Sequence, residues 1–169
     1  GIYDDALTHH ERALQLDSEE WSASSDFAFF LASCPIDKMR NGPRALELAT
    51  HACEATDFKT GQALHALAAA SAETGDFDAA VAFAAKGLKI AHETGEKKLI
   101  INALHSVGTA KHNKGDFAGA QKFFEDALAM AREAGETFEA AELANALGEL
   151  ARHREDYSAA QRLYEETLL

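Results

Sequence analysis

The side chains best suited to chemistry in this sequence are its eight histidines and two cysteines. Neighbouring His9 and His10 would project about 100° apart on a helix, which is unfavourable for binding one ion. His105 and His112 would share a helix face, but a separation of seven residues places them roughly 10 Å apart along the axis. Neither pair has the spacing of a metal site, so we expect no metal ligands.

The cysteines and the remaining motifs also argue against catalysis. Cys34 and Cys53 are too few for a disulfide framework, and packed free thiols are favoured over a bridge or a redox pair. Whether the two thiols touch stays open at this point. The sequence lacks a glycine-rich phosphate loop, a nucleophile elbow and zinc-ligand spacing. We therefore expect no catalytic residues and no cofactor.

The elements that carry these side chains follow a repeating pattern. Gly75-Asp76-Phe77, Gly115-Asp116-Phe117 and Glu155-Asp156-Tyr157 begin at positions 75, 115 and 155. A small residue follows each aromatic residue three positions later, at Ala80, Ala120 and Ala160. A repeat of this length, built from helices, predicts a solenoid that works as a binding surface rather than as a pocket enzyme.

The composition also favours helices and shows no sign of a membrane-spanning segment. It is 47% hydrophobic, rich in alanine, and holds only two prolines in 169 residues, which favours helices over strands. No apolar run approaches the roughly 18 to 20 residues of a membrane span, and residues 1–5 do not resemble a signal peptide. The chain begins without Met and in mid-pattern, so we expect it to be part of a longer protein. A net charge of −12 disfavours nucleic acid and anionic membranes as partners.

Apolar spacing and turn residues predict nine helices. We expect them at about 3–16, 19–33, 43–55, 60–74, 77–94, 97–113, 117–134, 137–153 and 157–168. The second helix should end at Cys34-Pro35, because proline disfavours a helical residue before it. Gly75, Gly95, Gly115 and Gly135 stand where a helix C-cap needs a left-handed residue. The connections are short, so successive helices should run antiparallel.

These residues resemble the tetratricopeptide repeat family. The Leu-Gly pair of that family's leading helix is matched by Val107-Gly108 and Leu147-Gly148, while Leu67-Ala68 and Phe27-Ala28 keep a small second residue. Small residues seven positions apart mark the trailing helices, at Ala6 and Ala13, Ala45 and Ala52, Ala80 and Gly87, and Ala120 and Ala127. The resemblance implies an all-α, right-handed superhelical solenoid of antiparallel helix pairs.

The resemblance also implies the domain organisation. We expect one array over residues 1–169, made of an orphan trailing helix (1–17), a repeat with an insertion loop (18–56), two full repeats (57–95 and 96–135) and a truncated repeat (136–169). Residues 27–54 are similar to a repeat variant of large multi-domain bacterial proteins. Residues 127–169 are similar to the repeat arms of bacterial regulatory ATPases and transcription factors. Both likenesses indicate a bacterial regulatory or assembly protein, and the low cysteine content favours a cytoplasmic location.

In such a solenoid the leading helices line a concave face. The residues expected to face a partner there are Ser25, Phe29, Gln62, His65, Asn102, His105, Thr109, His112, Asn145, Glu149 and Arg152. These columns are neutral to mixed in charge, so they could bind an extended peptide or a helix, basic or neutral rather than acidic. The alternative is that they are ordinary solvated polar positions. The lysine of the family's carboxylate clamp is absent, because His65, His105 and Asn145 stand in its place.

The resemblance implies a scaffold for protein–protein interaction. Two alternatives remain: a regulatory arm that contacts other domains of its own larger protein, and a self-association module that forms homo-oligomers through its terminal helices. The second alternative rests on Tyr3, Leu7 and Leu14 at one end and Leu168-Leu169 at the other, which we expect to lack an intramolecular cover.

Overall fold

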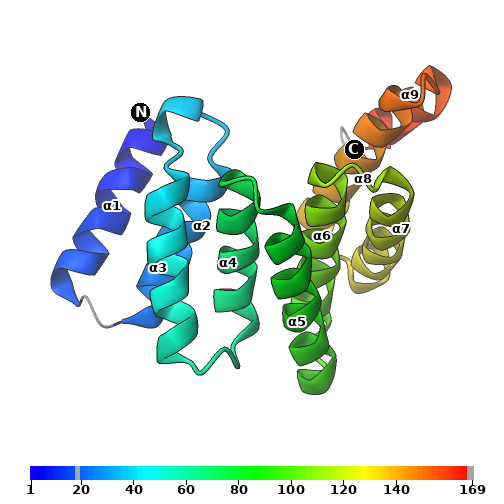
Figure 1. The fold of residues 1–169 in the computed structure, drawn as a ribbon. Coiled ribbons are helices and arrows are strands. Elements are labelled where there is room, and N and C mark those ends of the chain that lie inside the picture. Colours follow the sequence, from blue (N-terminus) through cyan, green and yellow to red (C-terminus); the bar gives the residue numbers. More distant parts are fainter. Residues whose placement is uncertain (18–19, 167–169) are drawn as a thin grey trace. The chain divides into compact units, whose positions relative to one another are not determined.

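The computed structural model describes residues 1–17 and 20–166, and this part of the chain consists of helices and short connections without a strand (Figure 1). The α-helices are α1 (Ile2–Leu16), α2 (Trp21–Ser33), α3 (Gly42–Ala55), α4 (Gly61–Glu73), α5 (Phe77–Thr94), α6 (Lys97–Asn113), α7 (Phe117–Ala134), α8 (Thr137–His153) and α9 (Tyr157–Glu166). They agree with the expected helices to within about two residues at the ends that are described. The predicted start at Glu19 and the predicted end at Leu168, with Leu169, lie outside the described residues. The sequence did not predict the short 3-10 helix η1 (Asp37–Met39) between α2 and α3.

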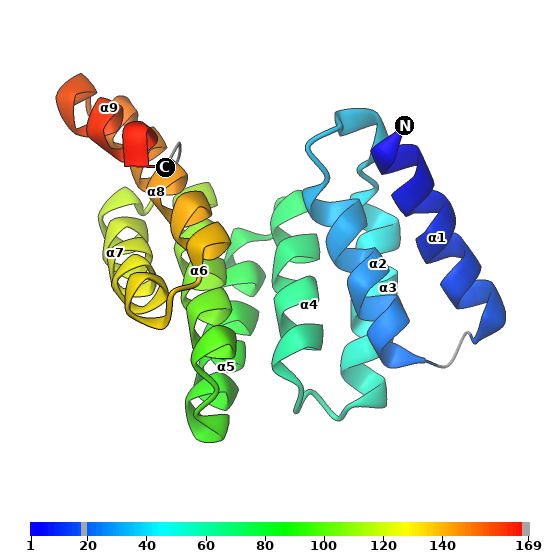
Figure 2. The ribbon, with the colours of Figure 1, turned by 180° about the vertical axis from the view of Figure 1, so that it is seen from behind.

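The chain divides into two compact units, Gly1–Ile90 and Ala91–Leu169. In the first unit α3 packs against α2 and α4, α2 also packs against α4, and α1 contacts α2 less extensively (Figure 2). In the second unit α7 packs against α6 and α8, and α9 packs against α8. Each unit therefore consists of successive antiparallel helices in which a leading helix is followed by a trailing one. That all the repeats form one array stays a prediction.

The Gly-Asp-aromatic motif builds the turn between helices. Gly115 adopts a φ of 88°, a left-handed conformation that closes α6 without the steric cost of a side chain. Asp116 then caps α7, because its Oδ1 accepts a hydrogen bond of 2.9 Å from the backbone N–H of Gly119. Asp76 and Asp156 accept the equivalent bonds, each of 3.0 Å. The repeated motif is thus a helix stop followed directly by a helix start.

Close helix crossings explain the small residues of the repeat. A Cβ atom placed on Gly108 would lie 2.5 Å from the ring of Phe124, so the aromatic ring occupies the space that the glycine leaves. Gly148 has the same relation to Tyr164. Trailing-helix alanines Ala120 and Ala127 are fully buried. The pairing of a glycine with an aromatic ring fills each crossing to the density expected of a protein core.

The inner face of α1 is covered, which corrects one expectation. Leu7 and Leu14 are half-buried and pack against the core of the first unit. A trailing helix packs against the leading helix that follows it, so α2 supplies this cover. The exposed apolar side chains of α1 are Ile2, Tyr3 and Leu16, which are 84%, 41% and 74% exposed. Leu168 and Leu169 lie outside the described residues. None of the helices in the described part of the chain combines the length and apolar character that crossing a bilayer requires.

Candidate functional site

The first unit contains a hollow that brings together four of the predicted partner-facing residues. Its volume is about 410 Å³, and α1, α2 and α4 line it. Ser25 and Phe29 come from α2, whereas Gln62 and His65 come from α4. We call this the leading-helix hollow; its remaining lining residues are Tyr3, His10, Asp26, Phe30, Ser33, Cys34, Pro35 and Ala66. The spacing between repeats therefore placed these side chains at one site.

Ser25 lies in the wall of the hollow and not on its open surface. It is only 1% exposed, and its hydroxyl donates a hydrogen bond of 3.3 Å to the backbone carbonyl of Gln62. This bond links α2 to α4 at the point where the two leading helices pack. The expectation that Ser25 meets a partner is therefore replaced by a structural role. Position 25 lies next to the small-residue column, and that proximity draws it into the helix interface.

Among the described residues that line the hollow, Asp26 is the one carboxylate. Its Oδ1 accepts a hydrogen bond of 2.8 Å from the Nε2 amide of Gln62. Gln62 is neutral, and no lysine or arginine among the described residues forms an ion pair with Asp26. The negative charge is thus held in place without being neutralised. The sequence reasoning missed Asp26, although it directly follows Ser25 and lies three residues before Phe29.

Aromatic rings form the other walls. Phe29 is 39% exposed, and its ring meets His65 edge-on with centroids 4.6 Å apart. His10 of α1 stacks on Phe27 at 5.4 Å and lies 5.2 Å from Phe30. Burial lowers the pKa of His10, and the nearby Asp26 carboxylate only partly opposes this shift. The imidazole of His10 is therefore neutral at pH 7 and does not compete as a cation for Asp26.

In the second unit, most residues of α6 that were predicted to face a partner are half-buried. His105 is half-buried against Phe124, with ring centroids 5.7 Å apart, and burial lowers its pKa. Asn102 is also half-buried, whereas Thr109 is exposed. His105 is thus a packing residue of the α6–α7 crossing. Its position two residues before the Val107-Gly108 pair brings it next to the ring that fills the glycine's space.

His112 takes part in a cluster of three rings. Its ring lies 5.4 Å from that of Phe117 and 6.0 Å from that of His153, while Phe117 and His153 stack at 5.7 Å. The Nε2 of His112 is buried and has no hydrogen-bond partner among the residues that the structure describes. The cluster joins the ends of α6 and α8 to the start of α7. It connects these elements of the second unit, and Phe117 and His153 remain exposed.

The predicted residues of α8 are partly engaged with α9. The Tyr164 hydroxyl donates a hydrogen bond of 2.5 Å to Oε1 of Glu149, and Arg152 donates one of 2.7 Å to Oε2. These donors lower the pKa of Glu149, with Tyr164 as the larger cause. Asn145 is exposed. In this unit, Thr109, Asn145 and Arg152 keep exposed side chains.

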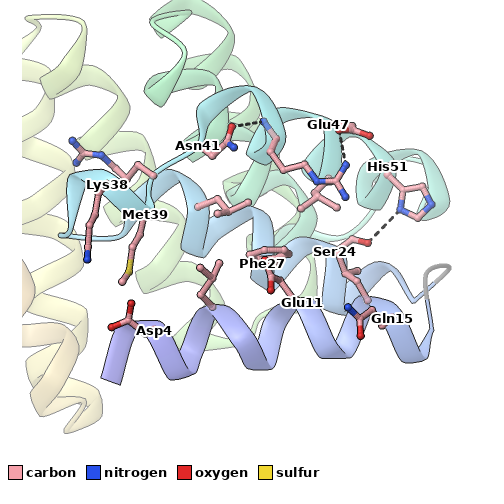
Figure 3. Close-up of a pocket in the computed structure, with 16 residues that line it drawn as sticks. Asp4, Glu11, Gln15, Ser24, Phe27, Lys38, Met39, Asn41, Glu47 and His51 are labelled. Carbon is pink, nitrogen blue, oxygen red and sulfur yellow. Dashed lines mark hydrogen bonds and ion pairs between the residues drawn. The ribbon is translucent and has the colours of Figure 1, made fainter. Parts of the chain in front are cut away.

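A second and larger cleft lies between α1 and the α2–α3 pair (Figure 3). Its volume is about 950 Å³. Figure 3 shows α1 along one wall with Asp4 and Glu11, while Lys38 and Met39 of η1 and His51 of α3 lie across from it. The sequence reasoning did not predict this cleft, because it exists only where the insertion loop folds back over α1.

The insertion loop has a fixed position at this cleft. The backbone N–H of Asn41 donates a hydrogen bond of 2.9 Å to the carbonyl of Leu31. Arg40 forms ion pairs with Asp37 at 2.8 Å and with Glu73 at 3.3 Å. Arg44 pairs with Glu47 at 2.6 Å. Both arginines are therefore neutralised within the chain. The cleft presents an apolar floor with balanced charge at its rim, and it selects no ligand by charge.

The reactive side chains do not form a chemical site within the described residues. Cys34 and Cys53 are both buried free thiols, and burial raises the pKa of Cys53 to about 11. A thiol with so high a pKa stays protonated at neutral pH and is a weak nucleophile. No group of three or more His, Cys, Asp or Glu side chains is gathered in the described ranges as a metal site would require.

The fold and the close helix crossings show that this chain is a helical repeat protein made of antiparallel helix pairs. Residues 99–168 match the tetratricopeptide repeat family model. This match confirms the resemblance seen in the sequence over residues 99–168. No curated protein sequence gives a significant match to the chain.

Solved structures of the same fold cover the whole chain. The crystal structure of a Rap protein complexed with Competence and Sporulation Factor has a TM-score of 0.81 at 17% sequence identity, covering 99% of this chain and 48% of that one. Two MamA structures have TM-scores of 0.60 and 0.59 at 13% and 14% identity; they cover 98% and 99% of this chain and 86% and 82% of theirs. The chain therefore spans about half the length of the Rap protein. These likenesses confirm the all-α, tetratricopeptide-like solenoid fold.

Proposed function

We propose that this protein binds a peptide segment of a partner protein along its leading helices, and that the leading-helix hollow is a principal contact. The observation that carries the proposal is the hollow itself, where Phe29, Gln62 and His65 from two different helices share one concave site. Ligand sites are concave and mainly apolar, with a few converging polar groups. Phe29 offers the apolar surface, and Asp26 and Gln62 offer the polar groups.

The chemistry of the described residues supports a non-catalytic role. The two thiols are buried, and the buried histidines serve as packing residues. A net charge of −12 favours a basic or neutral partner over nucleic acid or an anionic membrane. The Rap structure, which contains a bound factor, supports this proposal by analogy of fold alone. We place the protein in the cytoplasm, as part of a bacterial regulatory protein.

A peptide selection followed by a footprint tests the proposal. Random peptides displayed on phage are selected against the purified chain, and hydrogen–deuterium exchange is measured with and without the best binder. We expect protection in α2 and α4, around Phe29 and residues 62–66. Protection confined to the trailing helices α3, α5 and α7 would contradict the proposal.

A second candidate function is self-association through α1. Ile2 and Leu16 are 84% and 74% exposed, so this helix presents apolar side chains at its two ends. In that case light scattering should show a mass that rises with protein concentration, and Ile2→Glu with Leu16→Glu should return it to that of a monomer. A mass that stays monomeric at every concentration would exclude this function and leave peptide binding in place.

A further inference from the structure

We propose that the leading-helix hollow selects a cationic side chain of the partner, arginine in preference to lysine. This inference rests on the proposed peptide-binding function and specifies the chemistry that the site recognises. It is argued from three features: a carboxylate held at a fixed position, aromatic walls, and a lining that contains no lysine or arginine among the described residues.

The Asp26 carboxylate is oriented by Gln62 and retains capacity for a further donor. The Gln62 amide occupies one acceptor position at Oδ1, at 2.8 Å. An ionised carboxylate has about four acceptor positions in all, so both oxygens can still accept hydrogen bonds. A guanidinium can donate two parallel N–H bonds to such a group, whereas an ammonium acts as a point charge. The fixed orientation of Asp26 therefore favours arginine.

The aromatic walls suit the rest of an arginine side chain. Phe29 is 39% exposed and Tyr3 is 41% exposed, and both line the hollow from different helices. The faces of such rings attract cations and also pack against an aliphatic stem. The guanidinium plane stacks on a ring more favourably than a strongly hydrated ammonium does. A neutral apolar side chain would pack against the rings but would place no positive charge beside the Asp26 carboxylate.

Among the described residues that line the hollow there is no lysine or arginine to neutralise Asp26. His10 feels the Asp26 charge, but burial lowers the pKa of His10 below its ordinary value of 6.5 and favours the neutral imidazole at pH 7. Arg40 and Arg44, the arginines of the first unit's insertion region, pair with Asp37, Glu73 and Glu47 and line the other cleft. The hollow thus combines one fixed negative charge with apolar walls. This combination recognises a cation and rejects an acid.

The test uses four capped pentapeptides, Ac-Ala-Ala-Xaa-Ala-Ala-NH2, in which Xaa is arginine, lysine, citrulline or norleucine. Citrulline has the shape of arginine without its charge, and norleucine supplies only an apolar stem. Binding to the complete chain is followed by NMR through the backbone amides of Phe29, Gln62 and His65. We expect the arginine peptide to bind about tenfold more tightly than the citrulline peptide, the loss typical of removing one charge-assisted hydrogen bond.

Two variants assign this preference to the hollow. Asp26→Asn should abolish the difference between arginine and citrulline. Its matched control is Asp5→Asn, which removes the same charge from an exposed position of α1 outside the hollow and should leave the difference intact. Phe29→Ala should weaken all four peptides, because it removes a wall rather than the charge. Unchanged amide spectra elsewhere in the chain establish that each variant is folded.

The inference is overturned if arginine and citrulline bind equally to the unmodified chain, if Asp26→Asn keeps the preference, or if no peptide shifts these amides at millimolar concentration. Equal binding of arginine and citrulline at these amides would leave the proposed peptide binding intact and remove only the preference for a cation. Protection of trailing helices alone in the exchange experiment would instead remove the proposed function. The two failures are therefore distinguishable.

Discussion

At Glu155 the backbone adopts the left-handed conformation that glycine adopts in the other repeats. Its φ is 62°, while Gly115 at the equivalent position has a φ of 88°. A residue with a Cβ atom pays about 1 kcal/mol or more for this conformation, whereas glycine does not. The last repeat keeps the turn despite this cost, because Asp156 caps the helix that follows. Local strain is therefore confined to one residue of an otherwise regular motif.

Replacing this residue tests the strain directly. Glu155→Gly should stabilise the chain by about 0.5 to 1 kcal/mol, since the gain from relieved strain exceeds the entropy added to the unfolded chain. The reciprocal change, Gly115→Glu, should destabilise by a similar amount. Urea denaturation followed by circular dichroism measures both. A Glu155→Gly midpoint below that of the unmodified chain would show that the left-handed residue carries no strain.

The packing of His105 should make the stability of the chain depend on pH. Burial lowers its pKa below the ordinary 6.5, so the folded state binds a proton less readily than the unfolded state. The stability that this neutral imidazole contributes is complete above pH 6.5 and is lost as the pH falls through the lower folded pKa. We expect the urea midpoint to fall between about pH 7.5 and about pH 5. His105→Gln should reduce this dependence, and an unchanged slope would contradict the packed, neutral state of His105.

At the scale of helices, the sequence determined the positions of the elements closely. Period, glycine turns and acidic caps are local signals, and they located α3 to α8 to within one or two residues of where they lie. The candidate site was less predictable. Ser25 and His65 are 40 residues apart and both line the hollow, but this spacing could not show that Ser25 is buried or that Asp26 is exposed beside Gln62. Rotation of a helix about its axis depends on packing partners that differ between repeats.

The α6–α7 crossing depends on the pairing of Gly108 with Phe124. Gly108→Ala places a Cβ atom within about 2.5 Å of the Phe124 ring and should destabilise by about 1 to 3 kcal/mol. Phe124→Leu alone should also destabilise, because it loosens the core. In the double variant the smaller Leu side chain leaves room for the added methyl group. The double variant should therefore lose less free energy of unfolding than the sum of the losses in the two single variants. Strictly additive urea-derived free energies would contradict this crossing geometry.

At the scale of the whole molecule, the two units are built from the same kind of repeat but differ in the side chains that are available to a partner. In the first unit α1, α2 and α4 line a hollow with aromatic walls and the Asp26 carboxylate, which accepts a hydrogen bond from Gln62. In the second unit several of the expected contact residues are used internally: His105 packs on Phe124, and Glu149 binds Tyr164 and Arg152. Under the proposed function, the same sequence columns serve binding in the first unit and cohesion in the second. Partner recognition should accordingly depend more on the first unit.

The central claim, that a partner is bound at the leading helices, is tested most directly by two matched phenylalanine substitutions. Phe29 lies on leading helix α2 and Phe117 on trailing helix α7, and their exposed fractions are 39% and 40%. The Kd of a peptide selected from the phage library is measured for Phe29→Ala and Phe117→Ala. An aromatic anchor is worth about 2 kcal/mol or more, so Phe29→Ala should weaken binding at least about tenfold while Phe117→Ala changes it less than about twofold. Equal losses, or a larger loss for Phe117→Ala, would contradict binding at the leading helices.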